Sequence, residues 1–148
     1  MKMKADAPSE CASRILIVDD DPLSVQLYDM ILTRQGHYHV TAHEDPNTII
    51  ALVRKGEVDL IIMDVSLRNS RYKSVPVDGL TLTRILKVNP DTARVPVLLA
   101  TAHAMRGDRE TFLQESQADA YIAKPIIDTS LFLEQVAGLV QATIPVPE

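Results

Sequence analysis

Residues 14–21 read RILIVDDD, and this stretch decides the fold: an apolar run from Arg14 to Val18 leads directly into three aspartates. The same pattern recurs in the runs 58–63, 95–100 and 120–123, each of which ends at a polar residue. Short runs of β-branched and aliphatic residues, each followed by a helix-like segment, are typical of buried parallel strands. The sequence therefore predicts a parallel sheet with a polar group at the end of most of its strands.

The polar residues at the ends of these runs are expected to meet. They are Asp19, Asp20, Asp64, Thr101 and Lys124. In an open α/β sheet the carboxyl ends of the strands share one edge, where ligands bind. Three carboxylates at one edge repel each other, so a divalent cation is expected between them. A lysine and a hydroxyl beside that cation suit a phosphoryl group.

The predicted elements alternate strand and helix five times. A short edge strand is expected at residues 38–42, and the last helix from about Asp128 to about Gln141. Asp21 and Asp45, each followed by proline, are predicted helix caps, and Gly36 and Gly56 are predicted helix ends. The (βα)5 tally predicts a doubly wound α/β domain over residues 14–141, with flexible tails at 1–13 and 142–148.

Length, charge and cysteine content exclude several classes of protein. The chain has 148 residues, one cysteine and a net charge of −5. These features favour one domain and argue against a nucleic-acid surface and against an internal disulfide. No apolar stretch is long enough to span a membrane, and residues 1–13 lack the apolar core of a signal peptide. A cytoplasmic protein without membrane insertion is expected.

The motifs at the strand ends resemble those of the receiver domain of two-component response regulators, of the single-domain, chemotaxis-regulator type. The matching motifs are Asp19-Asp20, Asp64, Thr101-Ala102 and Lys124-Pro125, in the family's order along the chain. The resemblance covers about residues 14–141. It implies a flavodoxin-like sheet with the strand order 2-1-3-4-5.

The resemblance also implies a role for each site residue. Asp64 is the expected phosphoacceptor, with Mg²⁺ bound by Asp20, Asp64 and the main-chain carbonyl of Ser66, and by Asp19 through water. Lys124 is expected to pair with Asp64 at rest and with the phosphoryl group after transfer. Thr101 is expected to bind another phosphoryl oxygen.

The resemblance implies two further features near the phosphoryl site. Tyr121 falls on the family's aromatic switch position, although plain sheet packing is an equal alternative. The Lys124-Pro125 peptide bond is expected to be cis, since X-Pro bonds are the common place for cis peptides.

One stretch departs from the family pattern. Asp64 is not followed by the usual nearby proline, and the expected Asp-Gly pair arrives only at Asp78-Gly79. The segment from Arg68 to Val77 is therefore predicted to be a long loop at the active edge. Two interpretations remain open. The segment is either a functional loop, which recognises a partner or covers the site, or a neutral insertion.

Three functions compete. The leading one is a non-enzymatic signalling switch that takes a phosphoryl group from a histidine kinase or phosphotransfer protein and acts on a downstream protein by contact. The second is an aspartate-nucleophile phosphohydrolase, which places a second acid two residues after the nucleophile, where this chain has Ser66. The third is a receiver-like adaptor that works without phosphorylation, against which the complete set of site residues argues.

The remaining polar residues have simpler interpretations. Asp21 is expected to cap a helix rather than to join the acidic cluster. The three histidines His37, His39 and His43 are expected to be solvated rather than to bind a metal. His103 lies near the phosphoryl site by resemblance, where it either tunes hydrolysis or is an ordinary loop residue.

Overall fold

The computed structural model describes residues 13–66, 71–72, 75–76, 78–102, 108–124 and 126–143. Within these ranges, side chains are not described at 71–72, 75–76, 108–109 and 141–143. Several predictions lie wholly or mostly outside the described residues: the tails predicted at 1–13 and 142–148, the side chain of His103, and the Lys124-Pro125 bond. Residues 142–143 belong to α5 instead of the predicted tail.

The central sheet has buried inner strands because their residues are apolar on both faces, as strands covered by helices on both sides require. It contains β1 (Arg14–Val18), β2 (His39–Ala42), β3 (Leu60–Asp64), β6 (Val97–Thr101) and β7 (Ala120–Ala123). The strands are all parallel, in the order β2-β1-β3-β6-β7. In chain order of the five strands this is 2-1-3-4-5, so the predicted fold class is confirmed.

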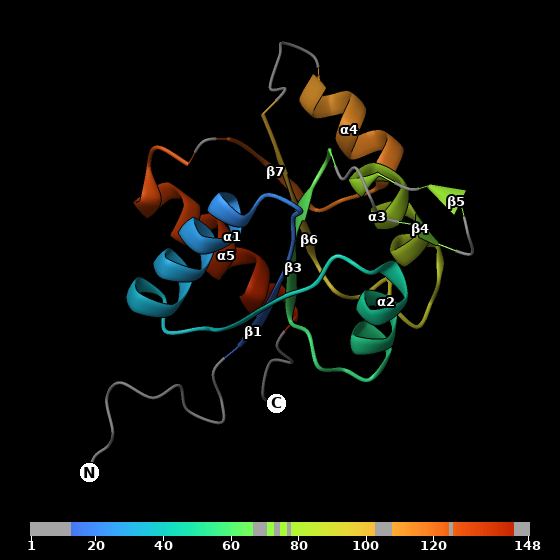
Figure 1. The fold of residues 1–148 in the computed structure, drawn as a ribbon, viewed down its shortest axis with the longest axis horizontal. Helices are drawn as coiled ribbons and strands as arrows, with labels where there is room; N and C mark the ends of the chain where they lie inside the picture. Colours follow the sequence, from blue (N-terminus) through green and yellow to red (C-terminus); the bar gives the residue numbers. More distant parts are fainter. Residues whose placement is uncertain are drawn as a thin grey trace.

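Helices cover both faces of the sheet (Figure 1). They are α1 (Pro22–Met30), continued by the π-helical turn η1 (Ile31–Gln35), then α2 (Pro46–Arg54), α3 (Gly79–Val88), α4 (Asp108–Ser116) and α5 (Thr129–Thr143). Alternate strand residues point to opposite faces. Leu16, Ile61 and Leu99 therefore pack toward α2 and α3, whereas Ile17, Ile62 and Leu98 pack with residues of α1 and α5.

The predicted helix caps are confirmed. The Asp21 carboxylate accepts a hydrogen bond from the Leu23 amide at 3.2 Å, and the Asp45 carboxylate accepts one from Thr48 at 3.1 Å. Gly56 ends α2 at a φ of +76°, which favours glycine. These caps determine where α1 and α2 begin, and α1 begins beside the predicted site.

Three strands have other boundaries than predicted, and the first of them, β2, begins at His39 rather than at Tyr38. The expected strands at 58–63 and 95–100 begin instead at Leu60 and Val97 and end one residue later than expected. Val58 and Val95 are buried but do not pair in the sheet. The prediction included them because an apolar run indicates burial and does not show which residues form the hydrogen bonds of a strand. Asp64 pairs in register with Ala100, and Thr101 with Ala123, so both polar residues close their strands.

The segment predicted as a long loop contains a second, small sheet that the sequence interpretation missed. β4 (Arg71–Tyr72) and β5 (Val75–Pro76) pair antiparallel, with Tyr72 opposite Val75. The segment leaves the carboxyl end of β3 and returns at Asp78, which caps α3. The prediction that it departs from the active edge is consistent with this topology.

Candidate functional site

Three carboxylates converge at the carboxyl edge of the sheet, as the sequence predicted. Asp19 and Asp20 follow β1, and Asp64 ends the neighbouring β3. One carboxylate oxygen from each lies within 4.8 Å of the other two. Asp19 and Asp64 are 3% and 6% exposed, so their charges are poorly solvated. This is an acidic cluster that favours a bound cation.

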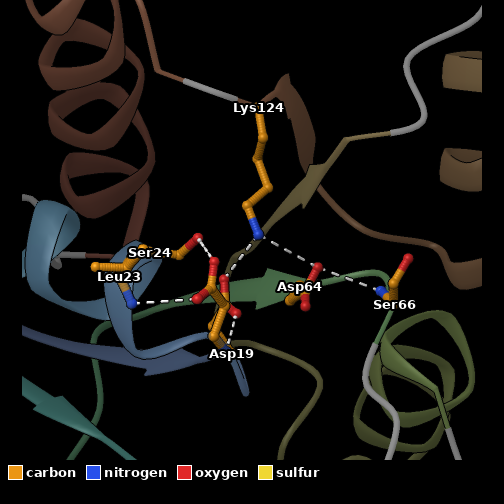
Figure 2. Close-up of polar contacts among 7 residues, drawn as sticks. Asp19, Leu23, Ser24, Asp64, Ser66 and Lys124 are labelled. Carbon is orange, nitrogen blue, oxygen red and sulfur yellow. Dashed lines mark hydrogen bonds and ion pairs between the residues drawn. The ribbon is translucent and has the colours of Figure 1, made fainter.

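Lys124 supplies the positive charge at this edge. Its side chain extends from the end of β7 toward the carboxylates, with Nζ 2.9 Å from Asp19 Oδ2 and 3.7 Å from Asp64 Oδ1 (Figure 2). The sequence interpretation paired Lys124 with Asp64, but Asp19 is the closer partner. The ammonium therefore bridges two carboxylates on adjacent strands.

One backbone amide also holds the Asp64 carboxylate. The Ser66 amide donates to Asp64 Oδ1 at 3.2 Å, which Figure 2 also shows. The Val65 amide donates to the Ala100 carbonyl at 3.0 Å, so the chain is still tied to β6 as it leaves β3. A charged acceptor held by a backbone donor has a defined orientation.

Gly79 allows α3 to begin directly against the end of β3. Its amide donates to the Val65 carbonyl at 3.0 Å, and a Cβ at this position would overlap the Asp64 carbonyl oxygen. Only glycine permits this approach of one backbone to another. The sequence interpretation noted the Asp78-Gly79 pair as a family feature but did not foresee this contact.

Thr101 lies on β6, between Asp64 on β3 and Lys124 after β7. Its side chain is fully buried, and its carbonyl accepts the Lys124 amide at 2.8 Å. Tyr121 lies on β7 in register with Leu99, and its ring centroid is 6.1 Å from that of Phe112 on α4. Tyr121 therefore joins the edge of the sheet to α4, which is compatible with both interpretations given above.

The electrostatics of Asp64 follow from its burial. Burial raises the pKa of Asp64 above its usual value, and the Asp19 carboxylate adds to the increase. Lys124 and the Ser66 amide oppose this increase by stabilising the charged form. Keeping Asp64 charged in this buried site therefore costs free energy, and a bound divalent cation would offset that cost.

The acidic cluster fits a small hard cation. Mg²⁺ takes oxygen ligands at about 2.1 Å, so two ligands on opposite sides of the ion stand about 4.2 Å apart. The three carboxylate oxygens lie within 4.8 Å of one another, close enough for the three side chains to hold one ion. Within the described residues, this is the one group of at least three acids, histidines or cysteines close enough to do so.

The other polar predictions are resolved more simply. Asp21 lies outside the metal-competent group, and its second oxygen accepts from Ser24 Oγ at 3.0 Å, as a helix cap does. The three histidines His37, His39 and His43 lie outside that group, and their solvated state stays a prediction. In the described part of the chain, no helix combines the length and apolar character needed to cross a membrane.

Sequence reasoning missed Tyr28, which lies in the core behind the site. Burial raises the pKa of Tyr28 well above its usual range, and Asp19, Asp64 and Asp21 raise it further, so the phenol stays protonated. Its ring stacks on Phe132 of α5 at a centroid distance of 5.7 Å. At helical spacing in an apolar stripe, a tyrosine gives the same signal as a phenylalanine, and nothing in the sequence marks its hydroxyl.

Known proteins share both this sequence pattern and this fold. The profile of the response regulator receiver domain matches residues 15–136. The response regulator PleD of Caulobacter vibrioides is 38% identical over 121 residues, which are 82% of this chain and 25% of PleD. The polar-differentiation response regulator DivK of Brucella anthropi is 32% identical over 112 residues, which are 76% of this chain and 84% of DivK. This chain thus spans about a quarter of PleD and most of DivK.

Solved structures agree. A receiver domain of a sensor histidine kinase from Pseudomonas aeruginosa, with a magnesium ion in its active-site cleft, superposes with a TM-score of 0.72 at 27% identity. The superposition covers 88% of this chain and 99% of that domain. A receiver domain of a histidine kinase from Syntrophus aciditrophicus gives 0.74 at 28% identity, over 92% of this chain and 96% of that domain. The chain therefore belongs to the response regulator receiver domain family.

Proposed function

We propose that this chain is a phosphorylation-controlled switch of a two-component phosphorelay. Asp64 accepts a phosphoryl group from a histidine kinase or a histidine phosphotransfer protein, and the phosphorylated chain acts on a downstream protein by contact. The observation that carries this proposal is the Lys124 ammonium between Asp19 and Asp64, at the edge where Thr101 also lies. The single cysteine agrees with a reducing cytoplasmic compartment.

The transfer step needs one nucleophile and a way to stabilise charge. An Asp64 oxygen attacks the donor phosphorus, a new P–O bond forms, and the bond to the leaving group breaks with its electron pair. From phosphohistidine the P–N bond breaks and the imidazole takes up a proton from water, whereas from acetyl phosphate the P–O bond breaks and acetate leaves as an anion. The protein mainly positions the groups and stabilises the charge on the transferred phosphoryl group.

The site residues divide this work. Asp19, Asp20, Asp64 and the Ser66 carbonyl would hold Mg²⁺, which neutralises negative charge on the phosphoryl oxygens when bound. The Lys124 ammonium lies 3.7 Å from Asp64 and would pair with an oxygen of the phosphoryl group after transfer. Thr101 would donate its hydroxyl to another phosphoryl oxygen.

We expect movement of Thr101 after phosphorylation to change the surface that a downstream protein contacts. Thr101 and Tyr121 lie on adjacent strands, and Tyr121 contacts Phe112 of α4. A phosphoryl group adds about −1.5 to −2 charges at pH 7 and draws donors toward it. We therefore place the output face on α4, β7 and α5, where a downstream protein would read the change.

Intact-mass measurement after incubation with acetyl phosphate and Mg²⁺ tests the proposal. One slowly decaying phosphoryl adduct on Asp64 supports the switch. Sustained turnover of phosphate esters would support the phosphohydrolase, and no adduct would support the phosphorylation-independent adaptor. Ser66 stands where the phosphohydrolase needs its second acid, which is why we favour the switch over that enzyme.

A further inference from the structure

The corner that joins α4 to β7, at residues 116–119, contains a strained residue. Gln117 has a φ of +64°, in the left-handed region where glycine is the usual residue. Its amide donates to the Leu113 carbonyl at 2.8 Å and so closes the last turn of α4. Such a backbone conformation costs free energy and persists where the surrounding structure enforces it. Contacts around this α4–β7 corner must therefore hold it in place.

Ser116 holds the helix side of the α4–β7 corner. Its side chain is fully buried, and its hydroxyl donates to the Phe112 carbonyl at 2.6 Å. The same hydroxyl oxygen accepts a hydrogen bond from the Ala118 amide at 3.1 Å. One side chain therefore ties the last turn of α4 to the residues that follow it.

Asp119 ties the strand side of the corner to β6 and α3. Its amide donates to the Val97 carbonyl at 3.0 Å, and its Oδ2 accepts from the Val97 amide at 2.8 Å. Lys87 of α3 places Nζ 2.7 Å from the same Oδ2 and donates to the carbonyls of Val95 at 2.8 Å and Ala93 at 3.1 Å. The Lys87 side chain is only 9% exposed. An ammonium that is shielded from water and has three acceptors holds its partners more firmly than an exposed ion pair does.

The rest of α4 is held by fewer contacts. Among its described side chains before Ser116, two are half-buried and four are exposed: Phe112 and Leu113 are half-buried, whereas Glu110, Thr111, Gln114 and Glu115 are exposed. The helix lies beside α3 at the periphery of the molecule (Figure 1). Few buried apolar contacts indicate low local stability. A helix that is fixed at one end and lightly packed along its length is free to tilt about the fixed end.

We propose that Lys87 and Asp119 are positioning residues that make the α4–β7 corner a fixed pivot, so that phosphorylation tilts α4 about its carboxyl end. This inference rests on the proposed function and adds a pivot to it. The chain continues from Thr101, at the end of β6, through residues 102–107 into the amino end of α4. The corner is tied instead to Val97, at the start of β6. A displacement of Thr101 toward the phosphoryl group therefore acts on the amino end of α4 while the corner stays in place.

A pivot predicts unequal displacements along α4. An α-helix rises about 1.5 Å per residue, so Thr111 lies about 9 Å and Glu115 about 3 Å from Gln117 along the axis. A tilt about Gln117 moves Thr111 about three times as far as Glu115. A shift of the whole helix moves both residues equally.

Spin labels on α4 measure these displacements. In a Cys11→Ser background, a reference label is placed at Lys55 and a second label at either Thr111 or Glu115, all of which are exposed except Cys11, which is outside the described residues. Pulsed EPR gives the distance between the two labels with Mg²⁺, before and after addition of beryllofluoride, a stable mimic of the phosphoryl group.

Two variants test which residue holds the pivot. Lys87→Met removes the ammonium from the corner. Arg84→Met is the matched control, because it removes an exposed cation about one turn earlier on α3. The same pairs of labels are measured in both variants, and beryllofluoride binding is measured by titration.

In the wild type we expect beryllofluoride to shift the label at Thr111 about two- to fourfold further than the label at Glu115. Arg84→Met should give the same ratio. In Lys87→Met the ratio should fall toward one, because the corner is released, while beryllofluoride still binds. A merely structural role of Lys87 would lower stability and leave the ratio unchanged.

Equal shifts at Thr111 and Glu115 in the wild type, or no shift although beryllofluoride binds, overturn the pivot and leave phosphoryl transfer to Asp64 intact. An unchanged ratio in Lys87→Met overturns the role of Lys87. If Lys87→Met does not fold, Asp119→Asn, which keeps the shape of the side chain and removes its charge, is measured against the same expectation. If the wild type binds no beryllofluoride and takes no phosphoryl group, the proposed function fails, and the pivot fails with it.

Discussion

Among the described residues at the carboxyl edge of the sheet, Lys124 and Asp19 form the shortest ion pair, with Nζ 2.9 Å from Oδ2 across 105 positions of sequence. The same ammonium stands 3.7 Å from Asp64. Lys124 therefore occupies, at rest, the region of negative charge that a divalent cation would also occupy. Stability, cation affinity and phosphoryl transfer should all depend on this one side chain.

Removal of the ammonium in Lys124→Met should separate these effects. Two buried carboxylates lose their cation, so we expect a loss of about 1–3 kcal/mol in the free energy of unfolding without divalent cations. Mg²⁺ should bind more tightly, because no ammonium competes for the carboxylates, while phosphorylation by acetyl phosphate should slow. Lys55→Met, at an exposed position, is the control. Denaturation, Mg²⁺ titration and the rate of labelling by acetyl phosphate check the three effects, and weaker Mg²⁺ binding in Lys124→Met would contradict the competition.

A methyl group at position 79 should disturb the end of β3. In Gly79→Ala the new Cβ meets the Asp64 carbonyl, which is backbone and cannot move aside cheaply, so we expect about 1–3 kcal/mol of destabilisation. Gly138→Ala is the matched control, because nothing lies within 4 Å of a Cβ there. Gly138 is in the interior of α5, so that substitution should stabilise by about 0.5–1 kcal/mol. Equal effects of the two substitutions on urea denaturation would show that the close approach at Gly79 is unimportant.

The pH dependence of stability should reveal the buried charge of Asp64. The folded state raises the pKa of Asp64, so between the unfolded and folded pKa values the folded state holds more protons. Stability then falls as pH rises through that window, and the loss is fully present above it. We expect Asp64→Asn to be more stable than the wild type at neutral pH without divalent cations. The difference should close as pH falls below the usual range for aspartate.

Denaturation midpoints across this pH range test the sign. Asp29→Asn, at an exposed position of α1, is the control and should differ little from the wild type throughout. If Asp64→Asn were instead less stable than the wild type at neutral pH, the ion pair with Lys124 would outweigh burial.

Shortening the segment from Arg68 to Val77 tests its role. The segment leaves the active edge after β3 and returns at the Asp78 cap, so a shorter connection that keeps Asp78 and Gly79 should preserve the fold. Loop length itself changes stability little, by about 0.6 kcal/mol per doubling. We expect acetyl phosphate to label the shortened protein normally, while transfer from the cognate kinase or binding of the downstream target weakens. Unfolding would make the β4–β5 pair structural, and two unchanged assays would make the insertion neutral.

The sequence predicted the parts of the site that topology determines. Asp19, Asp64 and Lys124 each end an apolar run, and a parallel sheet brings the ends of such runs to one edge. It did not predict that Lys124 prefers Asp19 to Asp64, since 2.9 Å against 3.7 Å depends on side-chain conformation. Two-residue strands such as β4 and β5 are too short to give a periodic signal.

Tyr28 shows a second limit of the sequence. Its ring lies in the core against Phe132, so an apolar helical stripe describes it well. Whether its hydroxyl has an acceptor depends on groups from other elements, which no local pattern records. A buried unpaired hydroxyl is visible only once those elements are assembled.

The acceptor assignment is the central claim, and mapping the phosphoryl group tests it most directly. Wild type, Asp64→Asn and the surface control Asp91→Asn are incubated with acetyl phosphate and Mg²⁺, followed by intact-mass measurement and peptide mapping. We predict one hydroxylamine-sensitive phosphoryl group, located on Asp64, in the wild type and the control, and none in Asp64→Asn. Retained labelling of Asp64→Asn at another carboxylate, or no labelling of the wild type, would contradict the account.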